Sequence, residues 1–139
     1  MVKPKLTFVT GNPNKLREVR EILGDHFEVV HDTTDLPEYQ GSCPEEITFE
    51  KCKEAAKTVP TPFIVEDVCL CFSAYKGLPG PYIKWFLGAI GREGLCKMLS
   101  GFEDKSAWAQ CTFAYLESPE KDPILFVGKT DGQIVSPFW

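Results

Sequence analysis

The sequence predicts an α/β fold, in which a long mixed β-sheet carries flanking helices, and one domain over residues 1–139. Three observations indicate this fold. A buried strand gives way to a helix at Gly11-Asn12-Pro13, a second apolar strand at Phe63–Val65 follows another helix, and residues 107–130 alternate like a β-hairpin. The length of 139 residues and the apolar content of 43% both fit a single globular domain.

The first helix carries clear local signals. Asn12 is a good N-cap, Pro13 suits the first helical position, and Gly24 is typical of a helix C-terminus. We therefore expect a strand over Lys5–Thr10 and then a helix to about Leu23. One face of this helix is apolar, made by Leu16, Val19, Ile22 and Leu23.

The remaining elements are predicted from apolar runs between turn residues. We expect strands at Phe27–His31, Phe63–Val65 (continued as an apolar run over Val68–Phe72), Ala107–Leu116 and Ile124–Thr130, and helices at Glu45–Lys57, Tyr82–Leu87 and Gly94–Leu99. Asp131-Gly132 is typical of a turn, so a further strand is predicted over Gln133–Val135.

Charge and composition exclude several classes of protein. The net charge is −5 and no basic run occurs, which argues against a nucleic-acid binder. No apolar run approaches the roughly 20 residues of a membrane span, and no signal peptide is evident. The six cysteines form no Cys-x-x-Cys pair, so we interpret them as reduced thiols of a cytoplasmic protein.

The first candidate site is Thr10-Gly11-Asn12-Pro13-Asn14-Lys15. Backbone N–H groups at a helix start can bind phosphate, and Gly11 lets a ligand approach closely. Lys15 lies one helical turn further on and would reach the same anion. The alternative is an ordinary capped turn between a strand and a helix.

The second candidate is Glu66-Asp67, which we place at the end of an apolar strand. Two carboxylates there are costly unless they are solvated, paired or bound to a metal. Mg²⁺ prefers one or two carboxylates together with substrate phosphates. The alternative is a strand that leaves the core for solvent.

Two further segments are less telling by themselves. Asp35–Gly41 is a polar loop, and Gly77–Phe86 combines a rigid Pro- and Gly-rich loop with Lys84 beside two aromatic residues. We interpret His26 and His31 as surface residues, because neither has a partner in the pattern. Cys69 and Cys71 would share one strand face and belong to the core.

Together these segments resemble the inosine triphosphate pyrophosphatase family. The matching pieces follow the family order across essentially the whole chain: Phe8–Asn12 with Lys15, Asp35–Gly41, Glu66-Asp67 with Cys69–Phe72, Gly77–Phe86 and Gly101–Ser106. Gly77–Phe86 is the most specific, and it argues against the related septum-inhibitor fold, whose members act on modified pyrimidine nucleotides. The resemblance implies a two-lobed fold with a nucleotide cleft, usually dimeric.

The resemblance also implies an activity and a site. The family hydrolyses non-canonical purine nucleoside triphosphates (ITP, dITP and XTP) to the monophosphate and pyrophosphate, with Mg²⁺ or alternatively Mn²⁺ as the metal, and so removes these nucleotides from the cellular pool. The substrate-binding residues would be Thr10, Gly11, Asn12, Lys15, Lys51, Glu66 and Lys84, the metal ligands Glu38 and Asp67, and the residue that activates water Asp67.

The sequence departs from the family after Val135. The family continues with segments that bind the purine base of the nucleotide, and Pro137-Phe138-Trp139 does not replace them. We therefore expect a chain truncated at its C-terminus, with reduced stability, an exposed strand edge at Gln133–Val135 and little choice among purines. The alternative to an active enzyme is an impaired form that binds nucleotide or a full-length partner without turnover.

Overall fold

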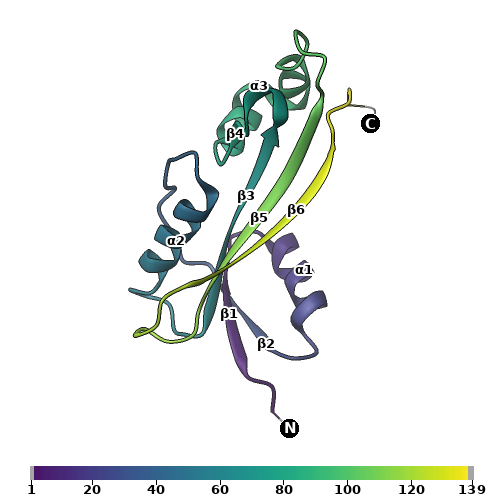
Figure 1. The fold of residues 1–139 in the computed structure, drawn as a ribbon. Helices are drawn as coiled ribbons and strands as arrows, with labels where there is room; N and C mark the ends of the chain where they lie inside the picture. Colours follow the sequence, from purple (N-terminus) through teal and green to yellow (C-terminus); the bar gives the residue numbers. More distant parts are fainter. Residues whose placement is uncertain (1, 138–139) are drawn as a thin grey trace. The chain divides into compact units, whose positions relative to one another are not determined.

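The structure is a computed structural model that describes residues 2–137. Phe138 and Trp139, at the C-terminal end discussed above, lie outside the described residues. Along the chain the elements are β1 (Lys5–Val9), α1 (Pro13–Leu23), β2 (Glu28–Asp32), α2 (Pro44–Ala55), β3 (Phe63–Phe72), the 3₁₀ turn η1 (Ser73–Tyr75), β4 (Pro79–Gly80), α3 (Ile83–Lys97), β5 (Ser106–Leu116) and β6 (Ile124–Gln133) (Figure 1).

The six strands form one mixed sheet in the order β2-β1-β3-β5-β6, with β4 paired to β3. β1 runs parallel to β2, in the register Phe8↔His31 and Val9↔Asp32, and parallel to β3 through Phe8↔Ile64. The short β4 pairs with β3 in the antiparallel sense. The predicted α/β fold with a mixed sheet and flanking helices is confirmed.

The described chain divides into two compact units. Unit 1 comprises residues 2–39, 47–66 and 113–126, and unit 2 comprises residues 40–46, 67–112 and 127–137. Unit 1 holds α1, β1 and β2, and unit 2 holds β4 and α3. The strands β3, β5 and β6 contribute residues to both units, and so does α2, whose residues 44–46 fall in unit 2.

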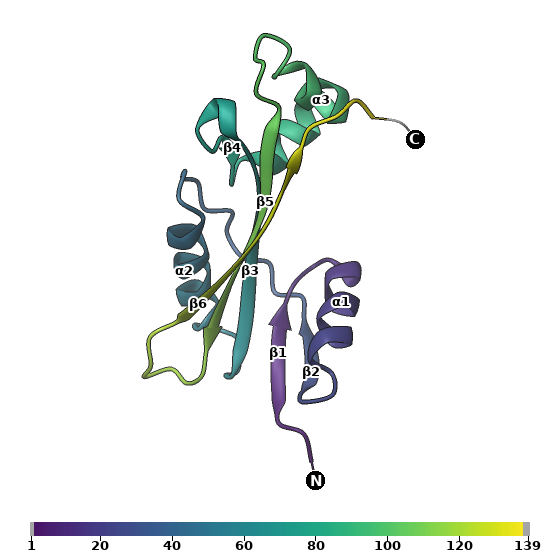
Figure 2. The ribbon, with the colours of Figure 1, turned by 45° about the vertical axis from the view of Figure 1, so that its right-hand side comes forward.

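In unit 1 the two helices cover opposite faces of the strands (Figure 2). On the α1 face, Leu16 and Val19 pack with Phe8 and Ile64. On the α2 face, Cys52 and Ala55 pack with strand residues that include Phe63 and Val65. Because neighbouring residues of a strand point to opposite faces, β3 supplies side chains alternately to the two clusters.

Unit 2 has its own apolar cluster. Phe72 and Leu99 are fully buried, and Leu95 and Ala107 complete the buried set. Gly91 interrupts α3, because its φ of 66° and ψ of −176° lie outside the helical region. The two short helices predicted on either side of this glycine are therefore one element with a break at Gly91.

The first helix follows its local signals. Asn12 caps it, accepting hydrogen bonds from the N–H groups of Asn14 and Lys15, and Pro13 stands at its first position. Gly24 is the C-cap, and its N–H donates to the Arg20 carbonyl over 2.8 Å. On its apolar face Leu16 and Val19 are buried, whereas 74% of Ile22 is exposed.

Two strand boundaries also differ from expectation. Glu66-Asp67 does not end a strand, since β3 runs through both residues to Phe72. Asp131-Gly132 does not form a turn, because β6 continues through it to Gln133, and Ile134 and Val135 lie beyond the strand. The separate edge strand predicted over Gln133–Val135 is therefore absent from the described residues, and the edge of the sheet on that side is β6.

Candidate functional site

The loop after β1 is held by its own polar groups. The Asn12 N–H donates to Thr10 Oγ1 over 3.1 Å, and the Asn12 side chain accepts from Asn14 and Lys15. These three backbone N–H groups therefore already have acceptors within the loop. In the described part of the chain, the Gly11 N–H has no acceptor, so it is the backbone donor that this loop presents to an incoming anion.

Gly11 has open space around its Cα. A Cβ built there would meet no described atom within 4 Å. The fold itself therefore does not require a glycine at this position. The requirement would come from a ligand that approaches the backbone closely, as phosphates do at strand-to-helix turns.

Lys15 and Lys51 converge on Glu66. The Lys15 Nζ lies 2.5 Å from Glu66 Oε1, and the side chains are 36% and 8% exposed, respectively. The Lys51 Nζ donates to the Glu66 main-chain carbonyl over 2.7 Å. A buried carboxylate is strongly unfavourable without a charged partner. The Lys15 ammonium group is that partner, so Glu66 is tolerated inside the sheet. The two ammonium groups and one carboxylate leave this cluster with a charge of +1.

Glu66 and Asp67 differ in where their side chains lie. They are adjacent residues inside β3, so their side chains point to opposite faces of the strand. Glu66 shares the face of Ile64, on the α1 side, where Lys15 meets it. The two neighbouring carboxylates of the predicted site therefore face opposite sides of β3.

Asp67 is half-buried and has a thiol neighbour. The Cys69 Sγ donates to Asp67 Oδ2 over 3.9 Å, a long contact that suits a weak sulfur donor. Burial raises the pKa of the Cys69 thiol to about 12, and the charge of Asp67 contributes in the same direction. The thiol therefore stays protonated at neutral pH. Cys69 and Cys71 are both buried, as predicted.

The other predicted residues lie on the surface. Glu38 is exposed in the loop before α2, and the neighbouring Tyr39 contacts Glu54 of that helix. Desolvation raises the pKa of the Tyr39 phenol, and the charge of Glu54 adds to the rise. In unit 2, Lys84 is exposed near the start of α3, with its Nζ 5.7 Å from the centroid of the Trp85 ring.

The structure thus brings Thr10, Gly11, Asn12, Lys15, Lys51 and Glu66 into one unit. Glu38 also belongs to unit 1, whereas Asp67 and Lys84 belong to unit 2. No group of three His, Cys, Asp or Glu side chains within residues 2–137 is arranged to hold a metal ion.

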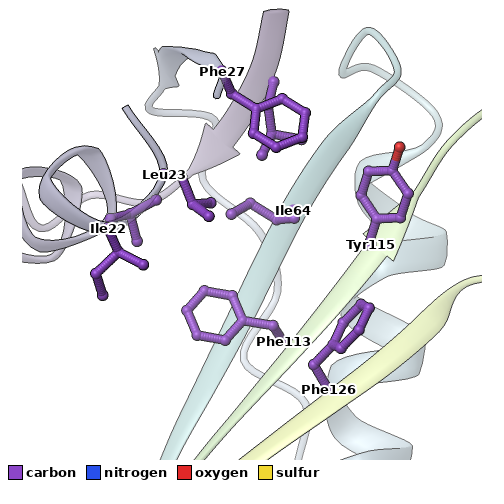
Figure 3. Close-up of a pocket in the computed structure, with 9 residues that line it drawn as sticks. Ile22, Leu23, Phe27, Ile64, Phe113, Tyr115 and Phe126 are labelled. Atoms are coloured by element: carbon purple, nitrogen blue, oxygen red, sulfur yellow. The ribbon is translucent and has the colours of Figure 1, made fainter. Parts of the chain in front are cut away.

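A separate hollow of about 500 Å³ opens on the α1 side of unit 1 (Figure 3). Its labelled walls come from α1, the segment after it, β3, β5 and β6, and are apolar or aromatic. They include the exposed Ile22 and Phe126. A highly charged ligand finds no compensating charge in such a lining, so this hollow is not the phosphate site.

Sequence reasoning missed one residue next to the loop. His31, which we expected at the surface without a partner, is half-buried, and its Nε2 lies 2.7 Å from the Thr10 carbonyl oxygen. The parallel pairing of β1 with β2 was the available signal, because it places the end of one strand beside the end of the other. His26 is exposed, as predicted.

Known proteins are similar to this chain over almost its whole length. The model of the Ham1 family matches residues 6–138. The inosine triphosphate pyrophosphatase of Neurospora crassa is 54% identical over 132 residues, which cover 95% of this chain and 69% of that protein. The protein of the same name from Ajellomyces capsulatus is 56% identical over 130 residues, covering 94% and 70%.

The chain belongs to the Ham1 family. Solved Ham1 proteins share its fold. That of Coxiella burnetii superposes with a TM-score of 0.80 at 24% identity, covering 94% of this chain and 72% of the other. The Staphylococcus aureus Ham1 protein gives 0.78 at 25% identity, with the same coverage of 94% and 72%.

Ham1 membership confirms the family resemblance seen in the sequence. The two inosine triphosphate pyrophosphatases are enzymes, and this chain matches about 70% of the length of each. Within residues 2–137, no helix is both long enough and apolar enough to span a membrane.

Proposed function

We propose that this chain is a nucleoside triphosphate pyrophosphatase. It would hydrolyse non-canonical purine nucleoside triphosphates, such as inosine triphosphate, to the monophosphate and pyrophosphate. The observation that carries the proposal is the charged cluster of Lys15, Lys51 and Glu66 beside the loop at Gly11, in a member of the Ham1 family. The named relatives at 54% and 56% identity support this substrate class.

The loop and the cluster supply the phosphate end of the proposed nucleotide cleft. A nucleoside triphosphate carries about four negative charges at neutral pH. Lys15 would meet it with an ammonium group, Gly11 with a backbone N–H, and Thr10 and Asn12 with their side chains. Glu66 keeps Lys15 in place before the substrate arrives, since the two side chains are in contact.

The donor chemistry fits Mg²⁺, or alternatively Mn²⁺. Asp67 and Glu38 offer carboxylate oxygens, the ligands that Mg²⁺ prefers, and both side chains are at least partly exposed. Fewer than three protein ligands is normal for Mg²⁺, which completes its shell with water and substrate phosphates. When bound, Mg²⁺ would neutralise phosphate charge.

Asp67 is the proposed base. It would take a proton from the water molecule whose oxygen attacks the α-phosphorus, while the bond from this phosphorus to the bridging oxygen breaks and pyrophosphate leaves. The carboxylate is half-buried, and the weak Cys69 thiol donates to its Oδ2 over 3.9 Å. Lys84, on α3, is proposed to bind the nucleotide with a further ammonium group.

The proposal includes an intracellular setting and an assembly. An enzyme that cleans the nucleotide pool would act in the cytoplasm, and the family resemblance favours a homodimer. Neither a nucleic acid nor a membrane is needed as a partner.

The test is phosphate release from inosine triphosphate and Mg²⁺, measured with malachite green. Orthophosphate should form only when inorganic pyrophosphatase is added, because the first product is pyrophosphate. Asp67→Asn should abolish the release and keep the fold, and a chelator should stop it until Mg²⁺ is restored. Full activity of Asp67→Asn would refute its role. Binding of the Mg²⁺ complex without release would support the non-catalytic alternative.

A further inference from the structure

We propose that His31 is a positioning residue that holds the Thr10–Gly11 peptide so that the Gly11 N–H faces the substrate phosphates. The inference rests on the proposed function, which assigns that loop to the triphosphate. It adds a residue of β2 that acts on substrate only through the loop backbone.

Two residues of β2 hold the backbone of Thr10. The Thr10 N–H donates to the Asp32 carbonyl over 3.0 Å, and the Thr10 carbonyl lies 2.7 Å from His31 Nε2. A carbonyl oxygen can only accept, so the Nε2 of His31 carries a proton in this contact. The imidazole is half-buried, which shields this hydrogen bond from exchange with water.

The carbonyl anchor fixes a neighbouring donor. A peptide group is planar and trans, so the Thr10 C=O and the Gly11 N–H point in opposite directions. Pinning the carbonyl toward β2 therefore directs the Gly11 N–H away from β2. Without that anchor the peptide plane is free to rotate, because glycine accepts backbone angles that other residues do not.

The direction of this N–H matters because the neighbouring donors are occupied. Asn12, Asn14 and Lys15 donate their backbone N–H groups to the cap within the loop. In the described residues Gly11 keeps an N–H that no protein acceptor takes, and its surroundings are open. A rotated Thr10–Gly11 peptide would instead present a carbonyl oxygen to the phosphates and repel them.

The experiment compares His31→Ala and His31→Gln with the wild-type chain. The Gln side chain has an N–H donor at similar reach, so it should restore the contact. Affinity for Mg²⁺-tripolyphosphate is measured by calorimetry, and KM and kcat for inosine triphosphate by pyrophosphate release. His26→Ala is the matched control, since His26 is an exposed histidine of the same unit.

We expect His31→Ala to weaken tripolyphosphate binding and raise KM by about 3- to 10-fold, the range of one hydrogen bond. The kcat should change by less than about twofold, because the reacting atoms are untouched. His31→Gln should recover most of the affinity, and His26→Ala should match the wild type.

Two results would overturn the inference. One is wild-type affinity in a folded His31→Ala protein that still hydrolyses inosine triphosphate, and this leaves the proposed function standing. The other is a loss of affinity in His31→Ala that His31→Gln does not restore. A wild-type chain that neither binds tripolyphosphate nor hydrolyses inosine triphosphate removes the proposed function, and the inference falls with it.

Discussion

Removing the ammonium group of Lys15 should destabilise the folded chain well beyond the cost of an ordinary surface lysine. The Lys15→Met variant keeps much of the side-chain volume but leaves the Glu66 carboxylate, 8% exposed, without the ammonium group that lies 2.5 Å away. Breaking a fully buried ion pair costs about 3–5 kcal/mol, and a surface pair about 0–1 kcal/mol. Because 36% of the Lys15 side chain reaches solvent, we expect about 2 kcal/mol.

A double-mutant cycle separates this pair from general damage to the fold. Glu66→Gln should cost less than Lys15→Met, since Gln retains the shape and Lys15 still reaches water. The double variant Lys15→Met/Glu66→Gln should be nearly as stable as Glu66→Gln alone, which corresponds to a coupling of about 1–2 kcal/mol.

Urea and thermal unfolding, followed by circular dichroism at neutral pH, measure these differences. For a chain of this size about 2 kcal/mol lowers Tm by roughly 6–8 °C. Lys53→Met is the control, because Lys53 pairs with Glu50 over 3.9 Å with both side chains more than half exposed. It should change stability by less than about 0.5 kcal/mol. If Lys15→Met costs no more than Lys53→Met, or the double variant shows no coupling, the Lys15–Glu66 pair does not hold the cluster together.

Three further variants or treatments test the loop at Gly11, the role of Lys15 and the buried cysteines. Gly11→Ala should leave Tm unchanged or slightly raised, because the new Cβ meets no described atom within 4 Å. The same variant should raise KM for any triphosphate. Thermal unfolding and kinetics check the two effects, and an unchanged KM would contradict a close approach of phosphate to Gly11. Lys15→Ala should raise KM for inosine and xanthosine triphosphates by the same factor, and a sharp difference between them would place Lys15 at the base. Burial raises the pKa of Cys52 to about 11 and of Cys69 to about 12, so both thiols are neutral at pH 8. Thiol reagents should therefore modify them only after denaturant is added. Mass spectrometry of briefly labelled native protein checks this, and labelling of either thiol without denaturant would contradict it.

Local signals predicted the parts of the fold that depend on neighbouring residues. Asn12 and Pro13 fixed the start of α1, because a cap and a first-turn proline act within one helical turn. The hairpin of β5 and β6 followed from its alternating strands and polar connection. The loop at Gly11 was recognisable for the same reason, since its donors and acceptors are close in sequence.

What failed depended on partners far along the chain. Glu66 looked like the end of a strand, since a carboxylate inside a sheet is costly. Lys15, from α1, compensates the carboxylate, and Lys51, from α2, binds the main-chain carbonyl of Glu66. His31 looked unpartnered because Thr10, which it contacts, is 21 residues away. At Asp131-Gly132 the pairing of β6 along the sheet outweighed the local preference for a turn.

The position of bond cleavage tests the central claim most directly. The chain is incubated with Mg²⁺ and inosine triphosphate, and the nucleotides are separated by anion-exchange chromatography at successive times, with Asp67→Asn as the parallel control. We predict inosine monophosphate and pyrophosphate in equal amounts from the earliest time, with no inosine diphosphate, and no products from the variant. Accumulation of inosine diphosphate with orthophosphate, or equal product formation by wild type and Asp67→Asn, would contradict the account.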